Sequence, residues 1–124
     1  MTYKIVIPGR LPGLNELINE SRRNRYAGNT MKRDAEFLVK LVARKLPTLK
    51  PPCDFVFDWV EKDKRRDKDN ISSGGRKIIF DSLVKLGKLE NDGWGQIGNY
   101  ADRFHVDKKE PRVVVTIIDK EGEE

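Results

Sequence analysis

The order of two apolar periodicities along the chain limits the folds it can adopt. Large apolar residues alternate with smaller or polar ones in residues 3–7 and 55–60, which predicts two strands, because successive side chains of a strand point to opposite faces. In residues 31–46 and 78–86, apolar residues recur every three or four positions, which predicts two amphipathic helices. Strands and helices therefore alternate up to the C-terminal third of the chain.

The C-terminal third is expected to add two more strands. Residues 100–107 and 112–119 have strand-like patterns, and the short segment between them predicts an antiparallel hairpin. The fold class is then α+β, with a mixed β-sheet packed by two main helices and a C-terminal β-hairpin. A chain of 124 residues suffices for one core, so we expect a small single domain over residues 1–124.

Capping and loop residues suggest where these elements begin. Asn29 or Thr30 is expected to cap the first helix. Before it, residues 8–29 are expected to form a long, basic and partly mobile loop. The acidic tail 120–124 is expected to fray.

Glycines mark the limits of the second helix. Gly74 and Gly75 are poor helix-interior residues, so the first turns are expected to be irregular. Gly87 predicts a left-handed cap at the C-terminal end of this helix. A turn is expected at residues 91–93, which read Asn-Asp-Gly.

The charge balance favours a polyanionic partner. There are 25 lysines and arginines against 20 aspartates and glutamates, which gives a net charge of +5. No segment approaches the roughly 20 apolar residues of a membrane span, and the N-terminus lacks the apolar core of a signal peptide. We therefore expect a cytoplasmic protein with no membrane partner.

Cysteine and histidine are too scarce for several kinds of chemistry. Cys53 is the only cysteine and His105 the only histidine, which rules out an intrachain disulfide and a structural zinc site. The same scarcity disfavours Ser-His-Asp and Cys-His catalysis. An active site in this chain would have to use carboxylates and lysine.

A charged run in residues 62–70 is the most informative segment for function. If the chain is extended there, the side chains of Asp67 and Asp69 lie on one face and could bind Mg²⁺ or Mn²⁺ through oxygen ligands. The alternative is that both carboxylates balance neighbouring lysines and arginines on a solvated loop. A calcium loop and a nucleotide-binding P-loop are excluded, because Ile71 and Ile78 occupy required positions, so no nucleotide cofactor is expected.

The combination of motifs resembles a known family. Residues 65–70 follow the pattern R-R-D-x-D-N, a lysine precedes F-D-S-L by about one helical turn, and residues 87–93 follow G-x-L-E-N-D-G. With the opening I-V-I-P and the later V-D-K-K-x-P-R, this order resembles the RusA family of Holliday junction resolvases, especially its phage and prophage branch. The resemblance covers most of the chain.

The resemblance implies a catalytic site. Asp67, Asp69 and Asp92 would bind the divalent metal, with Mg²⁺ as the cofactor and Mn²⁺ as a substitute, and Lys77 would be the catalytic lysine. Two features depart from the family: Asn91 stands where the family has an acidic residue, and the spacing between Asp69 and the helix is longer.

The implied function is that of a structure-specific DNA endonuclease. It would resolve Holliday junctions in DNA recombination and repair by paired metal-dependent phosphodiester hydrolysis. Two opposed cuts predict a C2 homodimer bound to branched DNA. The residues expected to contact DNA are Lys64, Arg65, Arg66, Lys68, Asn70, Arg76, Arg22, Arg23 and Arg25. Two alternatives stay open: a non-catalytic DNA-binding recombination accessory domain, and an endonuclease for forks or flaps.

Overall fold

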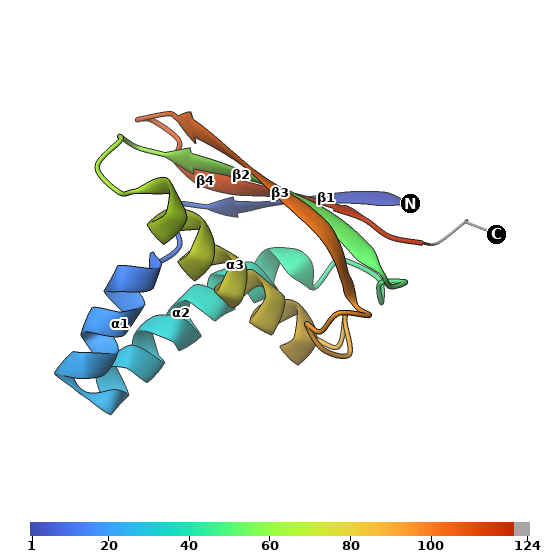
Figure 1. Ribbon diagram of the computed structural model, residues 1–124, viewed down its shortest axis with the longest axis horizontal. Coiled ribbons are helices and arrows are strands. Elements are labelled where there is room, and N and C mark those ends of the chain that lie inside the picture. The colour runs from blue at the N-terminus through green and yellow to red at the C-terminus, as the bar shows by residue number, and fades with distance from the viewer. Residues whose placement is uncertain (121–124) are drawn as a thin grey trace.

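Three helices pack against one face of a four-stranded mixed sheet, so the fold class is α+β as expected (Figure 1). The computed structural model describes residues 1–120. The elements are, in chain order, β1 (Thr2–Pro8), α1 (Leu14–Arg23), α2 (Arg25–Ala43), β2 (Cys53–Glu61), α3 (Lys68–Lys85), β3 (Ile97–Val106) and β4 (Arg112–Ile118).

The predicted C-terminal hairpin is wrong. The strand order is β1-β4-β2-β3, with β4 antiparallel to both of its neighbours and β3 parallel to β2. The helix-facing side chains of β4, those of Val113, Val115 and Ile117, are buried, whereas most of β3 is exposed. Burial of apolar side chains therefore favours a central position for β4 and leaves β3 at the edge.

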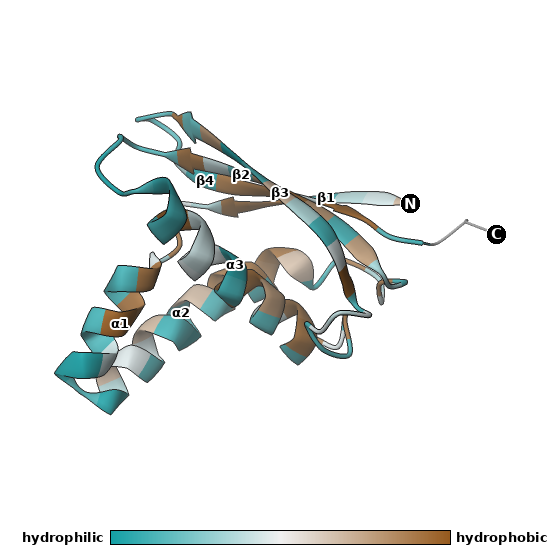
Figure 2. Cartoon of the chain, viewed as in Figure 1, coloured by the Kyte–Doolittle hydropathy of each residue, from teal (hydrophilic) through white to brown (hydrophobic). Residues whose placement is uncertain are grey.

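The strand β2 supplies the centre of the core. Phe55, Phe57 and Trp59 point toward the helices and are buried, and adjacent rings are 5.8 Å and 5.3 Å apart between centroids. These aromatic residues belong to the hydrophobic core. Figure 2 shows hydrophobic positions along the strands and a hydrophilic connection between β2 and α3.

The expected loop over residues 8–29 is instead largely helical. Helix α1 occupies its middle, and α2 begins at Arg25 rather than after Asn29. Asn24 caps α2 by accepting a hydrogen bond of 2.7 Å from the backbone N–H of Ala27. None of the residues of α1 is buried, so its apolar pattern gave only a weak signal in the sequence.

 A side chain of another helix caps the start of α1. Asn70 of α3 accepts a 2.7 Å hydrogen bond from the backbone N–H of Asn15.

Helix α3 is regular from its first turn, so the expected irregularity at Gly74 and Gly75 is wrong. A Cβ atom on Gly74 would lie 2.5 Å from the backbone nitrogen of Leu14, and one on Gly75 would meet the ring of Trp59. The two glycines therefore let α3 pack closely against the start of α1 and against β2.

The C-terminal end of α3 confirms the predicted cap. Gly87 has a φ of +75°, and its N–H donates to the carbonyl of Val84 at 2.9 Å. The N–H of Lys88 donates to the carbonyl of Leu83 at 2.9 Å, which completes a Schellman motif. The predicted turn at residues 91–93 also forms, with the Asn91 side chain accepting a 2.8 Å hydrogen bond from the Gly93 N–H.

The end of the described chain is held by the loop that precedes β2. The N–H of Lys120 donates to the carbonyl of Lys50 at 2.9 Å. The rest of the tail that was expected to fray, residues 121–124, lies outside the described residues. Within residues 1–120, no helix combines the length and apolar character needed to cross a membrane.

We predict that Gly74→Ala lowers the free energy of unfolding by about 1–3 kcal/mol, although alanine favours helix formation. The added methyl group would meet backbone atoms of residues 12–14, which cannot rotate away as a side chain can. Urea denaturation measures the change. Ser73→Ala is the control and should stay within about 0.5 kcal/mol of the wild type; an equally small effect of Gly74→Ala would refute the close packing of α1 on α3.

Candidate functional site

The charged run connects the end of β2 to the start of α3, beside the edge strand β3. A hollow of about 600 Å³ lies there, lined among others by Lys64, Asp67, Lys68 and Phe104. Lys68 lies over the ring of Phe104, with its Nζ 5.6 Å from the ring centroid. The hollow therefore brings Asp67 together with Lys64 and Lys68, two of the lysines predicted to contact DNA.

Arg66 points into the protein rather than toward solvent. Its guanidinium donates to both carboxylate oxygens of Glu61, from Nε at 2.9 Å and from Nη2 at 2.8 Å. Its Nη1 donates to Glu16 at 2.7 Å and to the carbonyl of Leu11 at 2.9 Å. The side chain of Arg66 is 13% exposed and that of Glu61 is 7% exposed, so this is a largely buried ion pair.

Pairing keeps Arg66 and Glu16 charged. Burial disfavours the charged guanidinium, but the hydrogen bonds and negative charges of Glu61 and Glu16 outweigh it and raise the pKa of Arg66. Burial by itself would raise the pKa of Glu16, yet the Gly13 N–H and the Arg66 guanidinium lower it below its ordinary value. Arg66 and Glu16 are therefore both ionised at neutral pH.

Two other predicted DNA contacts are also engaged within the protein. Asn70 accepts the hydrogen bond from Asn15 that caps α1. Arg76 forms a short ion pair with Asp102, and its guanidinium lies 4.7 Å from the ring centroid of Tyr100. Arg66, Asn70 and Arg76 are thus engaged in contacts within the chain, and their assignment to DNA stays a prediction.

Asp67 and Asp69 lie at the N-terminal end of α3, and the chain is not extended through both. Asp67 is the N-cap residue, with φ −67° and ψ 145°, whereas Asp69 is already in the first helical turn. Both are exposed, and Asp69 accepts a 3.3 Å hydrogen bond from the Ser73 hydroxyl. Carboxylates at this end of a helix are favoured by the helix dipole.

Asp92 lies at the opposite end of α3, in the loop before β3 (Figure 1). The 18 residues of α3 span about 27 Å. One chain therefore does not bring Asp92 to Asp67 and Asp69. Within residues 1–120, no group of three or more histidine, cysteine, aspartate or glutamate residues is arranged to hold a metal ion.

Lys77 is also separated from the two aspartates. It lies eight residues beyond Asp69, or about 12 Å along the helix axis. Its side chain is 62% exposed, and its Nζ is 3.6 Å from Asp81, which also pairs with Lys32 at 3.0 Å. Within one chain, Lys77 therefore forms an ion pair with Asp81 on the surface of α3.

The remaining basic residues are exposed. Arg65 is 87% exposed and pairs with Asp63 at 3.7 Å, while Lys64 and Lys68 are also accessible. A second exposed group, made up of Arg22, Arg23 and Arg25, lies around the turn between α1 and α2. The sequence alone did not separate these exposed cations from the engaged ones.

Cys53 and His105 both lie on strands, Cys53 at the start of β2 and His105 near the end of β3. Cys53 is buried, and burial together with the nearby charges of Asp119 and Asp54 raises its pKa to about 11, so the thiol is protonated at neutral pH. His105 lies on β3, and its Nε2 is 2.7 Å from Asp58.

The sequence interpretation missed Glu61, Glu16 and Asp102, the carboxylates that engage the basic residues near the candidate site. Glu61 ends a strand of apolar and aromatic residues, and a charge at such a buried strand end is a signal for an internal ion pair. Glu16 carried a second signal, because it stands three residues after Gly13, the spacing of a capping interaction.

No protein-family model matches the sequence, and no curated protein is significantly similar to it. The resemblance to the RusA family therefore rests on the motifs in residues 65–70 and 87–93 and stays a prediction.

We predict that Arg66→Ala lowers the free energy of unfolding by about 3–5 kcal/mol, because it leaves the buried carboxylate of Glu61 without a partner. Arg65→Ala is the matched control: it removes the same charge one residue earlier, from an exposed side chain, and should change stability by less than about 0.5 kcal/mol. Urea denaturation compares the two variants. Equal stability of both would contradict the structural role of Arg66.

A second prediction concerns how the stability of the fold changes as the pH is lowered. The pKa of Glu16 is lower in the folded chain than its ordinary value, so its ionisation stabilises the fold above that ordinary value. This contribution is lost as the pH falls through the lowered pKa. The stability difference between the wild type and Glu16→Gln should therefore be largest near neutral pH and shrink in acid. Denaturation curves over a pH series test this, and a difference that grows in acid would refute it.

Proposed function

We propose that the chain is a Mg²⁺-dependent endonuclease that cuts branched DNA, with the four-way junction as its substrate. The observation that carries the proposal is the state of Asp67 and Asp69. Within residues 1–120 neither carboxylate forms an ion pair, although basic residues surround both of them in the sequence. Arg65 pairs with Asp63 and Arg66 pairs with Glu61 and Glu16, so neither arginine neutralises Asp67 or Asp69.

Exposed oxygen ligands without a competing cation suit a hard divalent ion. Asp67 and Asp69 fit this requirement within one chain, whereas Asp92 does not reach them. A third carboxylate could come from Asp92 of the partner subunit if two copies associate about a C2 axis. Bound Mg²⁺ would supply an activated water and neutralise charge on the leaving oxygen.

The chain's own contribution to binding would come from the exposed cations beside the aspartates. Lys64, Arg65 and Lys68 stand around the hollow or next to it and can contact phosphates without reading base sequence. A homodimer would present two such sites, which matches the two opposed cuts that resolve a four-way junction.

A second candidate is a DNA-binding domain without nuclease activity. The specific observation in its favour is that no three-carboxylate group forms within residues 1–120. The two candidates share the basic surface and differ only in whether DNA is cut. Fork or flap endonuclease activity would use the same carboxylates and differ in the preferred DNA geometry.

We predict that Asp67→Asn, Asp69→Asn and Asp92→Asn each lower single-turnover cleavage of a four-way junction by several orders of magnitude in Mg²⁺. Each substitution removes a negative charge with little change of shape, so junction binding in a gel-shift titration should survive. Forks, flaps and linear duplex are tested in parallel. Asp34→Asn, on the exposed surface of α2, is the control and should cut at the wild-type rate.

The outcomes separate the candidates. Asn variants that cut at the wild-type rate would refute the carboxylate site, and a wild-type protein that binds DNA but never cuts would favour the accessory domain. In the same assay Lys77→Ala should slow cleavage without weakening metal binding. An unchanged rate would mean that Lys77 has no role in cleavage beyond its surface ion pair with Asp81.

A further inference from the structure

The face of the sheet that the helices do not cover carries a second hollow. It has a volume of about 660 Å³, and its floor is formed by the outward-facing residues Val60 and Val114 of the central strands β2 and β4. In Figure 1 the helices α1, α2 and α3 all lie on the other side of the sheet. This second hollow is a different one from the hollow that contains Asp67.

The two carboxylates in this second hollow are already engaged. Asp58 accepts two hydrogen bonds of 2.8 Å from Arg103 and lies 2.7 Å from His105. The bond from Arg103, with the further contact from His105, lowers the pKa of Asp58 despite its partial burial. Asp107 accepts hydrogen bonds from the Lys109 and Glu110 N–H groups and from the Arg112 side chain.

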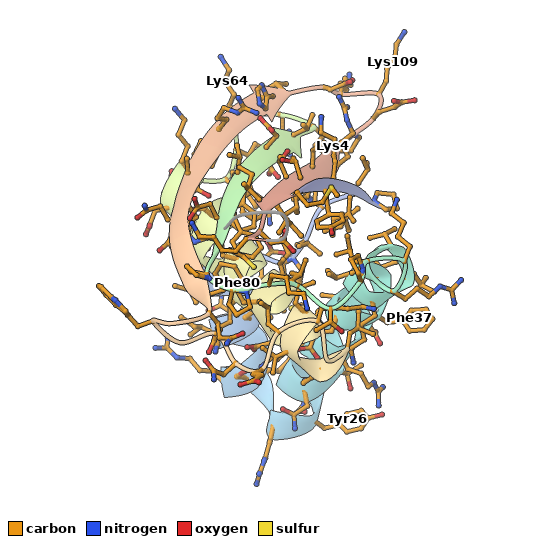
Figure 3. The ribbon with its side chains drawn as sticks, turned by 90° about the vertical axis from the view of Figure 1, so that its right-hand side faces the viewer. Lys4, Tyr26, Phe37, Lys64, Phe80 and Lys109 are labelled. Atoms are coloured by element: carbon orange, nitrogen blue, oxygen red, sulfur yellow. The ribbon has the colours of Figure 1, made fainter. Side chains whose placement is uncertain are left out.

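Three lysines of the same hollow have no such partner. Among the described residues, no ion pair or side-chain hydrogen bond involves the amines of Lys4, Lys108 or Lys109. Figure 3 shows Lys109 and Lys64 projecting from the same end of the molecule, with Tyr26 near the opposite end. Lys109 therefore lies at the end of the molecule where the charged connection to α3 also begins.

We infer that this hollow binds the phosphate backbone of duplex DNA that extends from the candidate cutting site. The two hollows meet at the end of β3, because His105 and Val106 line both. No phenylalanine, tyrosine or tryptophan lines the second hollow in the described chain, so it offers cations for phosphates and no platform for stacking bases. The inference rests on the proposed function, since it supplies the flanking contacts for the same substrate.

The test measures binding without cleavage. Fluorescence anisotropy with a labelled four-way junction in EDTA gives the affinity between about 50 and 200 mM salt. Lys108→Ala/Lys109→Ala should weaken binding and reduce the slope of log affinity against log salt by about 2, or about 1 per lysine. Lys108→Arg/Lys109→Arg keeps both charges and should keep the slope. Arg44→Ala/Lys45→Ala removes two exposed cations after α2, near the opposite end of the sheet, and should also leave it unchanged.

The outcomes distinguish this inference from the proposed function. If the alanine pair binds the junction with the wild-type slope while Asp67→Asn still abolishes cutting, the second hollow is not a DNA contact and the proposed function survives. If the wild type binds no DNA, both are overturned. If light scattering instead shows that the alanine pair dissociates a homodimer while each subunit keeps its affinity for DNA, the hollow is a subunit contact and the inference is wrong.

Discussion

The buried ion pair between Arg66 and Glu61 is the contact on which the candidate site depends. It joins the last residue of β2 to the residue before the Asp67 cap, and through Glu16 it also holds the start of α1. A guanidinium with little access to water needs carboxylate partners in fixed geometry. Meeting that requirement fixes where α3 begins, and therefore where the carboxylates of Asp67 and Asp69 emerge at the surface.

The distribution of paired charges explains why a modest net charge can still produce a basic surface. Glu61, Asp102 and Asp58 each engage an arginine. These carboxylates and arginines therefore neutralise each other inside the fold or along the sheet, whereas lysines such as Lys108 and Lys109 have no ion-pair partner within residues 1–120. Nucleic-acid backbones are attracted by such local excess charge rather than by the total.

Local patterns predicted the elements that local contacts stabilise. The apolar alternation of β2 and the left-handed glycine at Gly87 were both evident in the sequence, because each depends on residues a few positions apart. The predicted hairpin was wrong because adjacent strands in sequence need not pair, and burial of Val115 on the helix-facing side of the sheet is better served between β1 and β2. Helix α1 was missed because Asn70, which caps it, lies 55 residues away from Asn15.

The features of the candidate site also divide into those that the sequence determined and those that the tertiary structure decided. By itself the sequence determined which chemical groups are present: carboxylates and lysines in a basic chain with one histidine and one cysteine. Only the tertiary structure decided which of the adjacent arginines is a structural residue, because Arg66 meets Glu16 and Glu61 across the fold while Arg65 remains exposed. It also set Asp92 apart from Asp67, at the other end of α3. Neighbouring positions in a sequence have the same composition around them, but their partners depend on which segments the packed core brings into contact.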